Sequence, residues 1–264
     1  MRQACMILIG MIFSPAVRLF SSYVSGKGNQ SGWLGPLIAG IVTVGFIFVL
    51  WVLVKTGRSY TEQLQYSLGT IGSKIIMVLY LLWGTGLVSI HLRYCSERMV
   101  STVYSEMNMD IFVLVMAGLC VYTLIKGITT LGRISEIVLP IILFVSATLL
   151  ILLTREIEVQ SLLPIVDTES ILHVSLCNLA SFGYVTFLLF FTDDIHNTEH
   201  FRKNTIISVA VITAFSVWMF ISVIGSFGPY LIQKLSYPFL TVVKQISIGE
   251  FIQHIEAFII TLWI

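Results

Sequence analysis

Charged residues are scarce in this sequence. Only 11% of the 264 residues are Asp, Glu, Lys or Arg, whereas 56% are hydrophobic. Soluble domains typically carry about 25% charged and about 45–50% apolar residues. The net charge of +1 provides no basic surface, and Lys and Arg form no cluster of the kind that nucleic-acid binding requires. The composition therefore excludes an ordinary soluble protein and a nucleic-acid binder, and it indicates an integral membrane protein.

Cysteine motifs are also lacking. The four cysteines, Cys5, Cys95, Cys120 and Cys177, are scattered, with no CxxC pair and no metal-ligand spacing. Three of them lie in or beside apolar segments, where a free cysteine behaves as a small apolar side chain. We therefore expect buried free thiols, with no disulfide, no metal site and no cofactor.

Long apolar runs dominate the chain instead. A helix needs about 20 apolar residues to cross a bilayer, and about eight runs approach that length. Their approximate limits are residues 6–23, 33–54, 75–92, 111–125, 134–153, 171–191, 206–227 and an incomplete 251–264. The first run is interpreted as a span because no cleavage site typical of a signal peptide follows it. Short polar turns join the runs, which predicts one continuous, all-α helical bundle.

Lys and Arg in the short loops predict the orientation of the bundle. With a cytoplasmic N-terminus, the inside loops carry Arg2, Lys55, Arg58, Lys74, Lys126, Arg133, Arg202 and Lys203. The outside loops then carry Lys27, Arg93, Arg98, Arg155, Lys234 and Lys244. The slight excess inside favours a cytoplasmic N-terminus.

Two apolar runs contain an interruption. In the first, Phe13-Ser14-Pro15-Ala16 includes a proline that removes one backbone donor and clashes with the preceding turn, so the helix should kink or unwind near residues 11–14. In the sixth, Ser181-Phe182-Gly183-Tyr184 introduces small, flexible residues. A packed proline kink would explain the first alone. Interruptions at corresponding positions of two halves, however, indicate a binding site near the middle of the membrane.

Two charged residues fall within apolar runs, where burial of a charge is costly. Arg18 is either paired inside the bundle or snorkels to the outer interface. Glu256 is either a functional carboxylate or lies in the first turns of a helix that begins near residue 251. Both therefore stay as candidate intramembrane charges.

A third candidate follows the sixth run. The stretch His196-Asn197-Thr198-Glu199-His200 fits the H-x-x-E-H pattern of zinc proteases, in which two His bind the metal and Glu acts as a base. That pattern needs a folded catalytic domain and a third ligand. The loop here is short and lies between two spans, so a solvated cytoplasmic turn is favoured, and we do not expect an enzyme.

Several stretches together resemble the spore germination permease family, the B subunits of germinant receptors in spore-forming bacteria. These proteins are relatives of amino acid, polyamine and organocation transporters. The similar stretches are Gly32-Trp33-Leu34, Gly132-Arg133-Ile134-Ser135-Glu136, Leu139-Pro140-Ile141-Ile142, Ser161-Leu162-Leu163-Pro164, Tyr237-Pro238-Phe239-Leu240, residues 246–252, Glu256-Ala257-Phe258 and Trp263-Ile264. Their order and spacing cover essentially the whole chain.

The resemblance implies a LeuT-like fold of ten helices in two inverted repeats. About seven to eight of these helices would be present in a single domain, with a first repeat at about 1–155 and an incomplete second repeat at about 156–264. The chain would then be truncated at its C-terminus. The implied function is that of a receptor subunit in the spore inner membrane, which senses a small germinant such as an amino acid. Its implied partners are a receptor A subunit and a lipoprotein C subunit.

The resemblance also implies the positions of a ligand pocket. One wall would consist of Phe13, Ser14, Pro15 and Ala16, and the other of Ser181, Phe182, Gly183 and Tyr184. Trp83 is the candidate for an aromatic lid, although ordinary packing would also explain it. Helix ends at such breaks would suit the two charges of an amino acid. The alternatives left open are a secondary transporter of amino acids or cations and an inactive truncated fragment.

Overall fold

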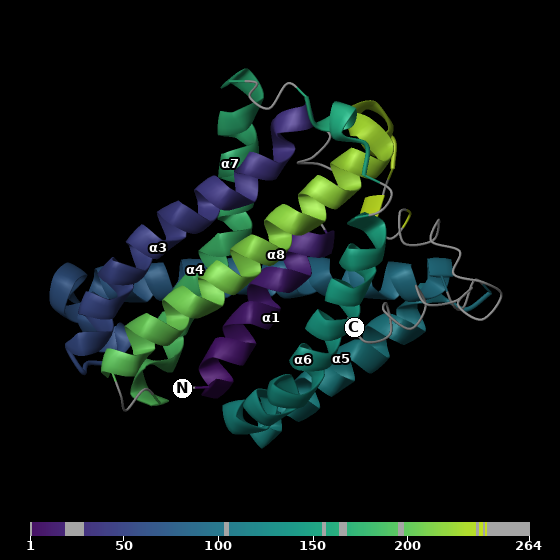
Figure 1. Cartoon of the computed structure of the whole chain (residues 1–264). Helices are drawn as coiled ribbons and strands as arrows, with labels where there is room; N and C mark the ends of the chain where they lie inside the picture. The colour runs from purple at the N-terminus through teal and green to yellow at the C-terminus, as the bar shows by residue number, and fades with distance from the viewer. Residues whose placement is uncertain are drawn as a thin grey trace.

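The computed structural model describes residues 2–18, 29–102, 106–154, 157–163, 168–194, 198–235, 238–239 and 241. Within these ranges the regular elements are helices, and no strand occurs. The elements are α1 (Arg2–Arg18), η1 (Asn29–Trp33), α3 (Leu34–Lys55), α4 (Tyr60–Thr102), α5 (Met109–Lys126), α6 (Ile128–Leu153), η3 (Val159–Leu162), α7 (Thr168–Phe182), η4 (Gly183–Asp194) and α8 (Thr198–Ile232). The η elements are 3₁₀ helices. Figure 1 shows α8 running diagonally across the view, with α1 and α3 beside it and α4 behind.

Six stretches of the described chain are long and apolar enough to cross a membrane. They are Gln30–Lys55, Tyr60–Glu97, Met109–Lys126, Thr129–Leu153, Ile171–Phe191 and His200–Ile232, and a shorter apolar helix covers Gln3–Phe13. The six long stretches correspond to the second to seventh predicted runs, and the shorter helix lies in the region of the first. The prediction of an all-α, multi-pass membrane protein is therefore confirmed. The predicted eighth run, 251–264, lies outside the described residues.

Glycine separates consecutive helices at several points of the described chain, among them Gly127 and Gly228. Gly127 adopts φ 84° between α5 and α6, a conformation that other residues rarely adopt, and its N–H donates to the Leu124 carbonyl at 3.1 Å. Within α8, Gly228 adopts φ 69° and is followed by Pro229. Proline is favoured at the first position of a helix because its missing N–H would have had no helical partner. The sequence thus provides a stop and a new start at both places.

The inner bundle consists of α1, α3, α6, α7, η4 and α8. Its core is a set of fully buried aliphatic and aromatic side chains, including Leu8, Ile12, Ile47, Leu50, Leu150, Ile212 and Phe220. Two glycines of α3 bring its neighbours close. A Cβ atom on Gly35 would lie 2.7 Å from Asn178 Nδ2 of α7, and a Cβ atom on Gly40 would lie 2.7 Å from Thr213 Cγ2 of α8. Small residues therefore set the helix spacing here, as is usual between membrane helices.

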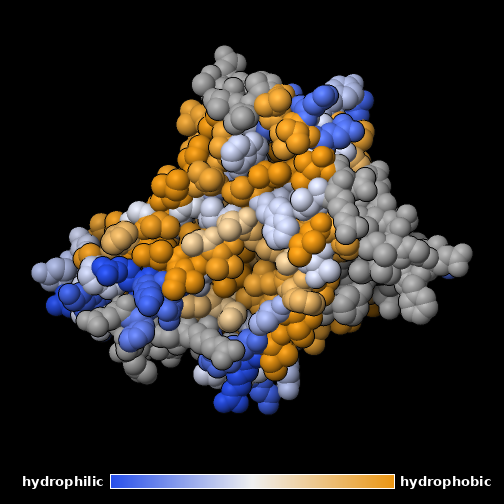
Figure 2. Space-filling model, viewed as in Figure 1, coloured by the Kyte–Doolittle hydropathy of each residue, from blue (hydrophilic) through white to orange (hydrophobic). Residues whose placement is uncertain are grey.

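The outer pair consists of α4 and α5. No side chain of α5, every residue of which is described, is buried. Large apolar side chains are exposed on both helices, such as Leu82 at 64% and Leu114 at 73%. Such exposure is favourable when the surroundings are lipid, because no apolar surface is then hydrated. Figure 2 shows that apolar residues also cover much of the visible face of the inner bundle.

Candidate ligand pocket

The sixth span changes its helix type at the predicted interruption. The α-helix α7 ends at Phe182, and the 3₁₀ helix η4 begins at Gly183 and continues to Asp194. Most 3₁₀ helices are only about 3–4 residues long, and longer stretches inside a helix often mark a functional hinge. The hydroxyl of Thr186 donates to the Gly183 carbonyl at 2.8 Å, which engages the first turn of η4.

The three-residue repeat of η4 separates two kinds of side chain. In a 3₁₀ helix, residues three apart lie above one another. Tyr184, Phe187 and Phe190 therefore share one face, with ring centroids 5.8 Å and 6.1 Å apart in succession. Val185 and Leu188 share another face and are buried in the inner bundle. The helix thus presents its aromatic face to a different neighbour.

That neighbour is α4. Trp83 stacks on Phe187 with a centroid distance of 5.1 Å and an interplanar angle of 4°. Tyr80 meets Phe190 edge-on at 5.5 Å, and Tyr60 meets Phe190 at 5.3 Å. We call these six rings the aromatic ladder: Tyr60, Tyr80, Trp83, Tyr184, Phe187 and Phe190. The ladder connects the outer pair to the inner bundle.

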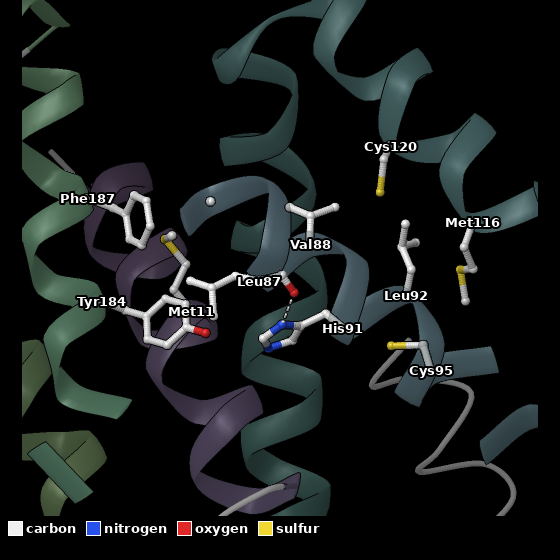
Figure 3. A pocket seen from close by; sticks show the side chains of 11 residues that line it. Met11, Leu87, Val88, His91, Leu92, Cys95, Met116, Cys120, Tyr184 and Phe187 are labelled. Atoms are coloured by element: carbon white, nitrogen blue, oxygen red, sulfur yellow. Dashed lines mark hydrogen bonds between the residues drawn. The ribbon is translucent and has the colours of Figure 1, made fainter. Parts of the chain in front are cut away.

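A pocket of about 440 Å³ lies at one end of the aromatic ladder. It is enclosed by α1, α4, α5 and η4, which are far apart in the sequence. Its lining consists of Met11, Gly84, Leu87, Val88, His91, Leu92, Cys95, Met116, Cys120, Tyr184 and Phe187. Figure 3 shows Tyr184 and Phe187 on one side, His91 and Leu87 in the middle, and the sulfur atoms of Cys95, Met116 and Cys120 on the other.

The pocket lining is largely apolar, and the described residues that form it include no Asp, Glu, Lys or Arg. Its strongest hydrogen-bonding groups are the His91 imidazole and the Tyr184 hydroxyl. His91 Nδ1 lies 2.8 Å from the Leu87 carbonyl oxygen (Figure 3). Because a carbonyl only accepts, Nδ1 carries a proton, and in the neutral ring Nε2 is then an acceptor. The His91 and Tyr184 rings meet edge-on at 6.3 Å, so the imidazole and the Tyr184 hydroxyl lie in the same part of the pocket.

The structure places the predicted pocket residues at different depths. Tyr184 lines the pocket, whereas Phe13, Ser181 and Phe182 are buried, and Phe13 packs edge-on against Phe215 at 5.1 Å. Trp83 belongs to the aromatic ladder and stands next to the pocket without lining it. Thus Tyr184 is the predicted residue that the structure brings to the cavity.

Gly183 has room beside it. A Cβ atom added there would meet no heavy atom of the described chain within 4 Å. Two residues earlier, the buried Ser181 hydroxyl has no hydrogen-bond partner among the described residues. An unpaired buried hydroxyl costs about 1–3 kcal/mol, so this group is available to a partner that the described chain does not supply.

Of the two outcomes predicted for the first span, a kink or an unwound segment, the unwound segment is wrong. The main chain of α1 is helical from Arg2 to Arg18, through Ser14, Pro15 and Ala16. Proline removes a single hydrogen bond, and packing against neighbouring helices can maintain a membrane helix through it. The side chains of Ser14, Pro15, Ala16 and Arg18 lie outside the described residues, as does all of Glu256.

Sequence reasoning missed most of the pocket lining. Met11, His91, Leu92, Met116 and the two thiols come from three different helices, and apolar runs give no information on which faces meet. His91 had a usable signal, since it lies eight residues after Trp83 and seven before Arg98 in an apolar run, on the helical face that Tyr80, Gly84 and Leu87 also occupy.

The expectations for cysteine and zinc have different outcomes. All four cysteines are free, as expected, but none is buried: Cys120 is exposed and the others are intermediate. Cys95 and Cys120 line the pocket, which leaves part of their surface accessible. Among the described residues, no group of three or more His, Cys, Asp or Glu could hold a metal ion. His196 and Asn197 lie outside those residues, and His200 is exposed near the start of α8.

The fold and the pocket together define a multi-pass α-helical membrane protein with a cavity between its helices. The sequence model of the family described as "Spore germination protein" matches residues 1–264. The chain therefore belongs to the spore germination protein family, and the resemblance inferred from its motifs is confirmed.

Curated relatives agree with this membership. Over 99% of its length the chain is 20% identical to spore germination protein YndE of Bacillus subtilis (strain 168), of which it covers 74%. It is 23% identical to spore germination protein KB of the same organism, with coverage of 91% and 67%, and 18% identical to spore germination protein B2, with coverage of 99% and 72%. No solved structure matches the chain. The relatives support a role in spore germination.

Proposed function

We propose that this protein is the B subunit of a spore germinant receptor and that it senses a small germinant, an amino acid, in the pocket beside Tyr184. The observation that carries the proposal is the change of helix type at Gly183. It turns Tyr184 and Phe187 toward α4, so that helices from distant parts of the chain enclose one cavity. Cavities of about 300–1,000 Å³ are typical of ligand sites.

The pocket chemistry supports an amino acid with an apolar side chain. Leu87, Val88, Leu92 and Met116 would surround that side chain. In an α-helix a carbonyl bonds to the N–H four residues ahead, and in a 3₁₀ helix it bonds to the N–H three residues ahead. Where the first type changes to the second, two successive carbonyls therefore compete for the same N–H. One carbonyl near Gly183 is then available to an ammonium group. The hydroxyl of Tyr184, which lines the pocket, would add a donor for the carboxylate.

The aromatic ladder would transmit binding. A ligand between His91 of α4 and Tyr184 of η4 contacts both sides of the boundary between the outer pair and the inner bundle. If binding favours one separation of these two helices, the stacked contact of Trp83 and Phe187 must adjust with it. The rearranged outer pair is the signal that we propose for the other receptor subunits.

The location and partners belong to the same proposal. We place the chain in the spore inner membrane, with a germinant receptor A subunit and a lipoprotein C subunit as partners. The chain would form a single permease-like domain of LeuT-like design, with repeats at about 1–155 and 156–264. The family membership and the printed names of the relatives support this assignment, and none of those names denotes an enzyme.

A secondary transporter of amino acids or cations is the second candidate. It would use the same pocket, because substrate sites of secondary transporters typically lie at interrupted helices in the middle of the membrane. Uptake of labelled amino acid by proteoliposomes that contain the chain alone would favour transport. A chain that supports neither uptake nor germination would be an inactive fragment.

The substitution Gly183→Trp tests the receptor proposal. Gly183 begins η4 directly before the pocket-lining Tyr184, and the open space beside it admits a larger side chain that would disturb this wall of the cavity without a clash in the core. Spores that carry the variant should lose their germination response to every member of an amino acid panel, measured as loss of optical density. The amount of the subunit in the membrane, measured by immunoblot, should not change.

Gly45→Trp is the matched control. Gly45 lies on α3, is exposed, and also has no described heavy atom within 4 Å of an added Cβ atom. Spores with this variant should germinate normally. A normal response in the Gly183→Trp spores as well would contradict the proposed site.

A further inference from the structure

Two cationic side chains lie near the ring of Trp51 of α3. Lys55 Nζ lies 5.2 Å from the centre of its ring, one turn further along the same helix. Arg202 Cζ of α8 lies 4.7 Å from the same ring and 5.8 Å from the ring of Phe48. Two like charges on one ring repel each other, so the arrangement is most stable with an anion between or beside them.

Further positive charge lies at the same end of the bundle. Arg58 is placed over the ring of Tyr66 at 5.0 Å, and Lys203 is exposed next to Arg202. Among the described residues, none of these cations forms an ion pair; the carboxylate of Glu62 accepts the Ser59 N–H instead. The side chains of Asp193, Asp194 and Glu199 are not described. The described side chains alone therefore form a basic patch with aromatic support.

The depth of the patch matches the membrane interface. The span Gln30–Lys55 ends at Lys55, so Trp51 lies in its last turn, at the level where tryptophan is enriched in membrane proteins. Hydrophilic residues gather at this end in Figure 2, directly beside apolar surface. The exposed side chains of Val49 and Val52 belong to that surface on α3.

We propose that Lys55, Arg202 and Trp51 bind the phosphate of an anionic phospholipid. A guanidinium stacked on an indole keeps its N–H edge available, and that edge fits phosphate oxygens in a bidentate manner. The acyl chains would lie against Val49 and Val52, which a free phosphate would not contact. The predicted orientation places this end in the cytoplasm, where the membrane surface is rich in anionic lipid.

The bound headgroup would connect α3 to α8, because Lys55 comes from one helix and Arg202 from the other. Both helices belong to the inner bundle, and none of these residues lines the pocket. The lipid site is therefore separate from the germinant site, and either one can fail without the other.

Quenching of Trp51 fluorescence by brominated lipid tests the inference. The purified full chain is reconstituted in vesicles of phosphatidylcholine that contain increasing brominated phosphatidylglycerol, and the signal of Trp51 is isolated by subtraction of the Trp51→Phe variant. Brominated phosphatidylglycerol should quench Trp51 of the wild-type protein more strongly than the same fraction of brominated phosphatidylcholine does. This difference is the preference for phosphatidylglycerol. Loss of each cation should weaken that preference about fivefold, so Lys55→Gln/Arg202→Gln should abolish it.

Lys126→Gln is the matched control. Lys126 Nζ lies 5.5 Å from the ring of Tyr122 of its own helix, at an end predicted to lie on the same side of the membrane. Among the described residues, it contacts no second ring, and no second cation lies over Tyr122. This variant should keep the preference. Lys55→Arg retains both charges and the stacked guanidinium of Arg202 and should keep it too, which separates charge loss from misfolding.

Four results would overturn the inference. They are a wild-type protein without preference, an equal loss in Lys126→Gln, a loss in the charge-retaining Lys55→Arg variant, and removal of the preference by an excess of inorganic phosphate. The last result would assign the site to a free anion.

Discussion

The inner bundle and the outer pair are both built from apolar helices, yet they pack differently. In α8, Ile212 and Phe220 are fully buried, whereas in α5 Leu114 is 73% exposed. Apolar character alone therefore does not decide which membrane helices pack closely, since lipid solvates an apolar side chain as well as protein does. The distinction between the two regions has to come from another property.

That property is close contact at small residues. Gly35 and Gly40 of α3 face side chains of α7 and α8 at distances that leave no room for a Cβ atom. Gly84 and Gly118 of the outer pair meet no described heavy atom within 4 Å. A glycine in an apolar run therefore does not by itself predict close packing of two helices. The pocket lies where the two regions meet, because Met11 and Tyr184 come from the inner bundle and His91 and Met116 from the outer pair.

The largest expected effect comes from Gly40→Leu. The new side chain would collide with the β-branched Thr213 of α8 and would separate two helices of the inner bundle. Overpacking of this kind typically costs about 1–3 kcal/mol, and we expect about 3 kcal/mol because both helices are held by further contacts. Thermal unfolding of the detergent-solubilised protein would measure the loss.

Gly45→Leu, on the same helix, separates packing from helix propensity. Its side chain would point into open space, so stability should stay within about 0.5 kcal/mol of the wild type. Similar losses in both variants would remove close contact as the distinction between the regions.

The contact between the regions should respond to Trp83→Ala. This variant removes the ring that stacks on Phe187 and contacts Tyr80 at 6.0 Å. Aromatic pairs contribute about 0.5–1.5 kcal/mol beyond their buried area. A double-mutant cycle with Phe187→Ala should therefore give a coupling energy of about 1 kcal/mol in thermal unfolding.

Leu82→Ala provides the comparison on the same helix, because Leu82 is 64% exposed on the lipid side. Its coupling to Phe187→Ala should be close to zero. If the coupling of Trp83 were also close to zero, the aromatic ladder would not connect the outer pair to the inner bundle.

The helices could be predicted from the sequence because lipid imposes their length and composition. The runs predicted at 33–54 and 111–125 correspond to α3 and α5 within about two residues. The run at 75–92 is shorter than α4, which extends from Tyr60 to Thr102, because α4 includes a separate helical segment before the kink at Gly69 (φ 71°) and because polar residues such as Arg93 continue the helix after the apolar part. Apolar length thus defines the spans better than it defines the helix ends.

The candidate site was only partly predictable. The change at Gly183 could be inferred from the local residues, since small residues in an apolar run weaken an α-helix. The continuity of α1 through Pro15 could not be inferred, because the neighbours of α1 decide whether a proline breaks the helix. The pocket depends on the rotation of α4 and α5 about their axes, which places His91 opposite Tyr184, and no local pattern specifies that rotation.

The smallest expected effect comes from His91→Phe, which keeps the ring but removes both nitrogen atoms. The imidazole faces Tyr184 across the pocket, and Nε2 is available to a ligand in the neutral ring. Loss of one hydrogen bond costs about 0.5–1.5 kcal/mol, so the germinant concentration for a half-maximal response should rise about three- to tenfold. His173→Phe, exposed on α7 and absent from the pocket lining, should leave that concentration unchanged. An unchanged concentration for His91→Phe would show that the germinant does not use the outer pair, and the site would then have to lie within the inner bundle, close to the unpaired hydroxyl of Ser181.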